Sequence, residues 1–291
     1  MWDTTYKAFT QKHTARVLWY SVLPFLCLGV GCAAIALAFN GAYASVLFIG
    51  VCFGVCLPLQ DTEADGSWPQ FVAGATLVAT PNTVHTLDHI VSRLRAQKLL
   101  PPQCAVLLNR TVVDVPKIYI RGFGSRKHAI VMPHLSRHVW RNGVAEAVIM
   151  HEVGHAAYWW SRIFRTDLNW TLDGVCTLAM FFQTGCMFIE FSNGNSILSD
   201  QSALGAMCCG IVSIVAHLST KLRLHSIEFL ADAYAARTLG VRGAQGLIQY
   251  FEDSANSAYG TPETCATESL THPSMQARIE ALKLFIRDAE Q

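Results

Sequence analysis

Two long stretches without a charged residue, close to the N-terminus, constrain the fold of this chain most. Residues 17–39 and residues 42–59 contain no Asp, Glu, Lys or Arg. At about 1.5 Å per helical residue, each stretch crosses, or nearly crosses, a hydrocarbon core of about 30 Å. The pair predicts a transmembrane hairpin that turns at Asn40 and Gly41. A secretory signal is the alternative for the first stretch, but its apolar run exceeds the roughly 7 to 15 residues of such a signal.

Two further uncharged stretches, residues 174–189 and residues 201–220, predict a second membrane hairpin. The first is short and the second contains several Ser and Thr residues, so a pair of buried helices in a soluble domain is the alternative. The composition favours the membrane interpretation, because hydrophobic residues make up 52% of the chain and charged residues only 15%. We therefore expect about four transmembrane helices.

Basic residues are distributed unevenly around these four stretches. The loops around residue 40 and from 190 to 200 contain no Lys or Arg, whereas the first 16 residues and the segments 60–169 and 221–291 contain many. By the positive-inside rule, both termini and the central segment lie in the cytoplasm. The formal net charge of +1 argues against nucleic acid as the main partner.

The segment from His151 to His155 reads His-Glu-Val-Gly-His, which is an HExxH pattern. Positions i and i+4 lie on the same face of an α-helix, so the two imidazoles can bind one ion. Glu152 lies about 100° around that helix, where it can reach an activated water molecule without binding the metal. Zinc peptidases use this arrangement, with the glutamate as the general base.

Two other histidine pairs have the same four-residue spacing. His85 and His89 enclose Asp88 in a segment with helix signals, and we interpret this pair as part of a solvated helix face. The aspartate is one methylene shorter than the glutamate of an inverted metal motif. His134 and His138 have no acid between them. Neither pair is predicted to bind a metal.

A catalytic zinc ion takes a third protein ligand, and Glu228 is the predicted one. Residues 224–236 read as one helix, whose small residues permit close packing against a neighbouring helix. Glu228 and Asp232 share a face of this helix, so Asp232 can accept a hydrogen bond from a ligand histidine. An ordinary pair of surface acids is the alternative, although two like charges at this spacing destabilise a solvated helix slightly.

These motifs resemble those of the integral-membrane zinc metallopeptidases that include the HtpX heat-shock proteases and the CAAX prenyl-protein proteases. Residues 145–155 are similar to the active-site helix of that family, and residues 228–236 to its glutamate-ligand helix. Residues 271–279, with His272 and Arg278, are similar to its C-terminal segment. The three matches occur in the order that the family shows.

The resemblance implies a mainly α-helical fold with a small β component, in which a zincin-like protease domain is attached to about four transmembrane helices. Membrane hairpins would occupy residues 1–59 and 170–220, and residues 60–169 and 221–291 would form the protease domain. It also implies quality control of membrane or misfolded proteins at a lipid bilayer. The active site would face the cytoplasm, and a bacterial inner membrane is the favoured location.

The predicted reaction is zinc-dependent hydrolysis of peptide bonds in polypeptide substrates. His151, His155 and Glu228 would hold one zinc ion per chain, and Glu152 would move a proton from the attacking water to the leaving amine. By resemblance alone, His272 would be a second hydrogen-bond donor to the oxyanion. A loop histidine that precedes a proline is the alternative for His272.

A different class of protease is the main alternative, because Leu172-Asp173-Gly174 resembles the metal motif of intramembrane site-2 proteases. In that class His151, His155 and Asp173 would bind the metal within membrane-spanning helices. The few residues between His155 and Asp173 leave no room for a complete crossing and return. A membrane scaffold without catalytic activity is a further alternative, but it leaves Glu152 without a purpose.

Three short segments rich in branched residues, 105–113, 117–120 and 128–132, predict strands. We expect the last of them to be an edge strand that pairs with extended substrate. Eight of the ten cysteines fall within the four apolar stretches, and no CxxC pair is present. Thiolate coordination of zinc is therefore not predicted.

Overall fold

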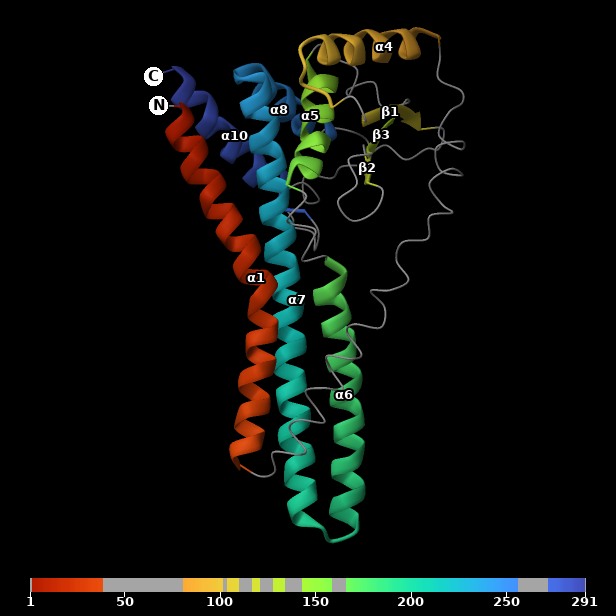
Figure 1. The fold of residues 1–291 in the computed structure, drawn as a ribbon, viewed down its shortest axis with the longest axis vertical. Coiled ribbons are helices and arrows are strands. Elements are labelled where there is room, and N and C mark those ends of the chain that lie inside the picture. Colours follow the sequence, from red (N-terminus) through yellow and green to blue (C-terminus); the bar gives the residue numbers. More distant parts are fainter. Residues whose placement is uncertain are drawn as a thin grey trace. The chain divides into compact units, whose positions relative to one another are not determined.

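The structure is a computed structural model that describes residues 2–38, 81–101, 104–109, 117–120, 128–133, 143–158, 166–255 and 272–290. Its helices are α1 (Trp2–Ala38), α4 (Pro81–Ala96), α5 (Val144–Ala157), α6 (Thr166–Ser192), α7 (Ser196–Leu239), α8 (Val241–Ala255) and α10 (Met275–Glu290). Its strands are β1 (Cys104–Asn109), β2 (Lys117–Ile120) and β3 (His128–Pro133) (Figure 1). The prediction of a mainly α-helical chain with a small β component is confirmed.

The chain forms two compact units. Unit 1 consists of Met1–Ala15, Ala64–Ile163 and His225–Gln291, and unit 2 of Arg16–Glu63 and Phe164–Leu224. The long helices α1 and α7 each contribute residues to both units. Unit 1 is therefore assembled from three separate stretches of the chain.

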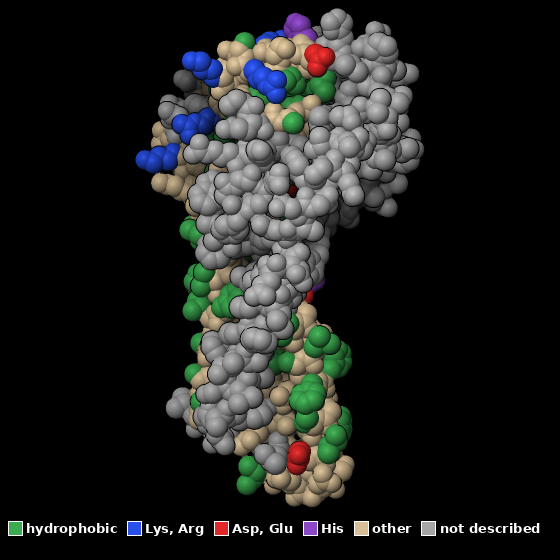
Figure 2. Space-filling view, turned by 45° about the vertical axis from the view of Figure 1, so that its right-hand side comes forward, with side chains coloured by type: hydrophobic (Ala, Val, Ile, Leu, Met, Phe, Trp, Pro, Cys, Tyr) green, Lys and Arg blue, Asp and Glu red, His purple; other side chains and the backbone are tan. Residues whose placement is uncertain are grey.

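Unit 2 has the character of a membrane helix bundle. Within it, α1, α6 and α7 pack through an apolar core of Leu28, Cys32, Ile35, Leu172, Cys176, Cys208, Cys209, Val212 and Ala216. The outward-facing side chains are apolar as well: Phe181, Phe182 and Phe191 of α6 are 65–75% exposed. Figure 2 shows such hydrophobic side chains in green along the described part of these helices. A soluble bundle would not expose so many large apolar groups to water.

Three helical stretches are long and apolar enough to cross a membrane: Thr4–Ala36, Leu172–Ser192 and Ser199–Leu239. They overlap or contain three of the four predicted spans. The fourth predicted span, residues 42–59, lies outside the described residues. The three apolar helices indicate that the chain associates with a membrane.

The sheet of unit 1 has the strand order β1-β3-β2. Strand β3 pairs with β1 in parallel and with β2 in antiparallel orientation. The three predicted strands are confirmed, with residues 110–113 outside the described part of the chain. The expectation that residues 128–132 form an edge strand is wrong, because a strand that is hydrogen-bonded on both sides has no edge left for a substrate.

Helix α5, which carries the HExxH segment, forms the centre of unit 1. It follows Gly143, whose φ of 83° is readily adopted by glycine and strained for most other residues. Twelve of its residues are buried, from Val144 to Ala156 with His155 as the exception. A Cβ atom at Gly154 would lie only 2.9 Å from the Cα atom of Ala231 in α7. This close approach places the HExxH helix directly against the helix of Glu228.

Candidate metal centre

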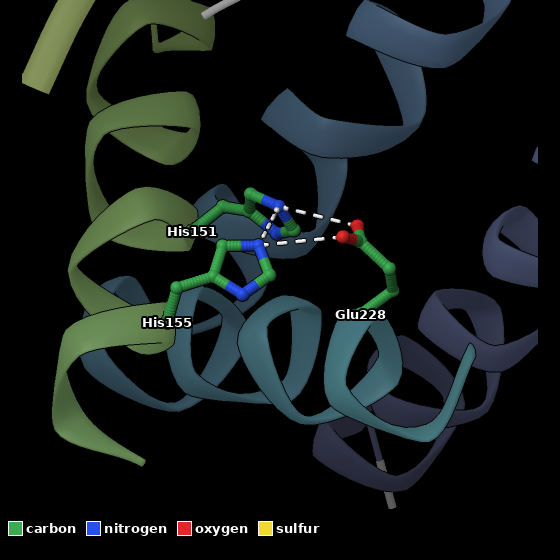
Figure 3. Close-up of side chains that lie close together, drawn as sticks. All are labelled: His151, His155 and Glu228. Carbon is green, nitrogen blue, oxygen red and sulfur yellow. Dashed lines mark hydrogen bonds and ion pairs between the residues drawn. The ribbon is translucent and has the colours of Figure 1, made fainter. Parts of the chain in front are cut away.

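His151 and His155 of α5 and Glu228 of α7 converge on one point (Figure 3). The two Nε2 atoms of the histidines lie 3.1 Å apart. Glu228 Oε2 lies 3.6 Å from His151 Nε2, and Glu228 Oε1 lies 3.5 Å from His155 Nε2. Among the described residues, these three form the group of potential ligands that lie within 4.8 Å of one another.

The spacing of these donor atoms fits a zinc ion. Zinc binds imidazole nitrogen at about 2.0–2.1 Å and carboxylate oxygen at about 2.0–2.2 Å in tetrahedral geometry, so neighbouring ligand atoms stand roughly 3.3–3.5 Å apart. The observed separations of 3.1, 3.5 and 3.6 Å bracket that value. Two imidazoles and one carboxylate also form a common ligand set of catalytic zinc sites, which keep a fourth position for water or substrate.

A second carboxylate fixes the orientation of His151. Asp232, one helical turn after Glu228, has its Oδ1 atom 2.8 Å from Nδ1 of His151. Burial disfavours the charged imidazole, but the hydrogen bond and the negative charge of Asp232 outweigh this effect and raise the pKa of His151. With Nδ1 bonded to Asp232, Nε2 is the nitrogen that faces Glu228 and His155, as a metal ligand requires.

The carboxyl group of Glu152 is buried beside the ligands. Burial raises its pKa to about 7, and the negative charge of Glu228 acts in the same direction. A group with a pKa near neutrality both accepts and returns protons at neutral pH, which is what a general base in hydrolysis needs.

The buried charges balance when a divalent cation is added. Glu152, Glu228 and Asp232 are each no more than 7% exposed, and in the described part of the chain Arg278 is the buried arginine beside them. When the histidines are neutral, as metal ligands must be, and all three carboxylates are ionised, these groups and the guanidinium carry a net charge of −2. Such an excess of buried negative charge is costly, and a divalent cation offsets it.

His272 lies at the exposed side of the ligand group. Its side chain is 59% exposed, and Nδ1 lies 3.2 Å from Glu228 Oε1. The structure thus brings His272 next to one of the potential ligands. The buried His225, one turn before Glu228 on α7, is not a member of the ligand group.

Asp173, the acid of the alternative metal motif, has different partners. Ser213 Oγ donates a hydrogen bond to one carboxylate oxygen of Asp173, and His217 Nδ1 lies 3.3 Å from the other. Thr177 Oγ1 lies 2.9 Å from Ser213 Oγ. Asp173 therefore belongs to a polar cluster between α6 and α7, and the metal-ligand group contains Glu228 instead.

The other histidine pairs do not join the described site. His89 is exposed on α4, as expected for a solvated helix face, and the side chain of His85 lies outside the described part of the structure. His134 and His138 also lie outside the described residues. The described cysteines are free thiols.

Two residues near the centre were not assigned a role from the sequence. Arg278 of α10 contacts both Glu228 and Asp232. Tyr250 of α8 is largely buried, which raises its pKa to about 12, and the charges of Glu152 and Glu228 contribute. No local spacing relates either residue to the HExxH segment. The family resemblance included Arg278 without a role, and the tertiary structure shows what both residues contact.

The model of peptidase family M48 matches residues 85–285, which is more than half of the chain and includes every residue of the ligand group. No curated protein and no solved structure matches this chain. The matched segment confirms, at the level of the family, the resemblance to membrane metallopeptidases. The chain therefore belongs to peptidase family M48.

Proposed function

We propose that this metallopeptidase is a membrane-bound zinc endopeptidase, in which His151, His155 and Glu228 hold one zinc ion and Glu152 is the general base. The convergence of these three side chains at zinc-like separations is the observation that carries the proposal. The burial of Glu152 beside them supports its role as the base.

Each residue around the ion has a separate role in the proposed hydrolysis. A bound zinc ion would act as a Lewis acid toward the peptide carbonyl and lower the pKa of water. Glu152 removes a proton from the attacking water and delivers it to the leaving amine. Asp232 keeps His151 in the tautomer that presents Nε2. His272, which is exposed beside Glu228, donates a hydrogen bond to the oxyanion.

We infer that the chain divides into a protease domain and two membrane hairpins, with bounds that differ slightly from those of the two compact units. Residues 60–169 and 221–291 form the protease domain, and residues 1–59 and 170–220 form membrane hairpins. The basic segments then place the termini and the metal centre in the cytoplasm. The apolar helices support a bilayer as the setting. The peptidase family supports unfolded or membrane polypeptides as the substrates, and the net charge of +1 argues against nucleic acid. Protein quality control, with a bacterial inner membrane as the favoured location, is the role that we assign.

Substitution of Glu152 by Gln tests the proposal. The variant keeps the shape of the side chain but not its basicity, so we expect zinc content to stay and hydrolysis of an unfolded model protein to fall by about 10²- to 10⁴-fold. Zinc is measured by atomic absorption on detergent-purified protein, and hydrolysis by peptide release. Glu252→Gln, which changes an exposed acid of α8, is the matched control and should hydrolyse normally.

The same assays separate the alternatives. Glu228→Gln should lose zinc, whereas Asp173→Asn should retain zinc and activity. Zinc loss in the Asp173 variant alone would favour a site-2-type centre. A zinc-loaded wild-type protein that cleaves nothing would favour the scaffold, and equal activity of the wild type and Glu152→Gln would refute the assigned base.

A further inference from the structure

The side chain of Arg278 enters the centre from α10, a third helix that supplies no ligand. Arg278 is 8% exposed, and its guanidinium carbon lies 4.2 Å from the ring centroid of Phe251 in α8. A cation over an aromatic face gains electrostatic energy that grows when water is excluded. The ring of Phe251 thereby holds the plane of the guanidinium from one side.

The edge of the guanidinium contacts two carboxylates of α7. Nε and Nη2 donate hydrogen bonds to Oδ2 and Oδ1 of Asp232, at 2.7 and 2.6 Å. Nη1 lies 3.1 Å from Oε2 of Glu228. All three donor nitrogens of one side chain are thus directed at the candidate ligand and at the residue that orients His151.

These contacts offset the repulsion between two buried carboxylates of the ligand helix α7. Glu228 and Asp232 are like charges four residues apart, and both are buried, so they repel each other where water cannot screen them. A guanidinium has five N–H donors in a planar fork and can satisfy both carboxylates at once. The point charge of a Lys ammonium cannot reproduce the bidentate geometry.

We propose that Arg278 is a positioning residue of the metal centre, which presets the carboxylate of Glu228 directly and the imidazole of His151 through Asp232. The role rests on the proposed zinc function. Arg278 does not touch substrate in this scheme. Arg278 lowers the free-energy cost of reorienting the ligand side chains when the ion binds. Its substitution should therefore change the metal affinity and not substrate binding.

The test is the zinc affinity of Arg278→Lys, measured on purified protein by competition with a chromophoric chelator. Loss of a partner that orients a metal ligand weakens binding by about 10- to 100-fold, and we expect that range. The KM for a peptide should not change, and saturating zinc should restore most of the turnover. Arg287→Lys, on the exposed face of α10, is the matched control and should bind zinc as the wild type does. An affinity of Arg278→Lys within twofold of the wild type would overturn the role.

A double-mutant cycle shows whether Arg278 acts through Asp232. As a single substitution, Asp232→Asn should weaken zinc binding. In the Arg278→Lys background it should weaken binding little further, because the two residues form one contact. Fully additive effects would contradict the scheme. If Arg278→Lys does not fold, Phe251→Leu removes the ring under the guanidinium and should still weaken zinc binding measurably; an unchanged affinity would then overturn the proposal.

The affinity measurement needs no substrate, so the two hypotheses fail separately. A wild-type protein that binds zinc but hydrolyses no peptide would refute the proposed function. The zinc affinities of the Arg278 variants could still be compared with the wild type. Unchanged zinc binding in the variants of an active enzyme would refute the role of Arg278 alone.

Discussion

The absence of a side chain at Gly154 determines how closely the two ligand helices approach. An added Cβ atom would lie 2.9 Å from Cα and 3.0 Å from the carbonyl oxygen of Ala231. Those atoms belong to the backbone of α7 and cannot rotate away. The separation of His155, the next residue on α5, from Glu228 therefore depends on this glycine.

We expect Gly154→Ala to push α5 away from α7. Overpacking of this kind costs about 1–3 kcal/mol of folding free energy. It should also weaken zinc binding, because His155 moves with the helix. Thermal unfolding in detergent and chelator competition measure the two effects. Gly185→Ala of α6, whose added Cβ atom meets nothing within 4 Å, is the control. A normal melting temperature in the Gly154 variant would contradict the packing argument.

Residue spacing indicated two pairs of side chains that the structure places at the candidate centre. The i, i+4 geometry of one helix relates His151 to His155, and that of another relates Glu228 to Asp232. That the two helices meet was expected from the usual ligand set of zinc and from the family resemblance, not from periodicity. Arg278 could not be predicted in this way, since 46 positions separate it from Asp232. Contacts between distant segments depend on tertiary packing, which leaves no local pattern in the sequence.

At the scale of helices, Glu146 connects the active-site helix to two neighbours. It lies in the first turn of α5, and its carboxylate is 1% exposed. Arg93 of α4 and Arg242 of α8 form ion pairs with its two oxygens. The arginines are 40% and 59% exposed, so they reach the buried acid from the solvent side.

We expect Glu146→Gln to destabilise the packing of α4 and α8 on α5 without removing zinc. Loss of a hydrogen-bonded charge pair costs about 1.5–3 kcal/mol. Denaturant unfolding should report this loss, and zinc content should stay normal because Glu146 is not a ligand. Asp88→Asn, an exposed acid of α4, should unfold as the wild type does. Unchanged stability of Glu146→Gln would show that the ion pairs contribute nothing.

Helices and strands were easier to predict than their arrangement. Charge-free runs located the apolar parts of α1, α6 and α7, and branched residues located β1, β2 and β3. The order β1-β3-β2 was missed, because proximity in sequence to the active-site helix suggested that β3 was an edge. Parallel pairing of β1 with β3 joins segments separated by another strand, and side-chain alternation does not encode that connection.

At the scale of the whole molecule, the distribution of charge predicts an orientation in the membrane. The turn between α6 and α7, residues 193–195, contains no basic residue and is exposed, whereas α4 carries Arg93 and Arg95. By the positive-inside rule, we propose that this turn faces the outside and that α4 faces the cytoplasm.

Thiol labelling of intact cells tests this orientation. We expect a membrane-impermeant maleimide to label Asn193→Cys in sealed cells, and to label Ser92→Cys of α4 only after the membrane is permeabilised. Both positions are exposed in the structure. The wild-type chain, with its ten cysteines, provides the background. Labelling of Ser92→Cys in sealed cells would place the metal centre on the outer side.

Unit 1 is built from three stretches that the residues of unit 2 interrupt, and this has a consequence for synthesis. His151 leaves the ribosome early, but Arg278 follows 127 positions later. Because domains fold as their residues emerge, the incomplete polypeptide lacks the groups that close the centre. We therefore expect a nascent chain of this design to stay inert during its own translation, until the last stretch of unit 1, which carries Glu228 and Arg278, has been made.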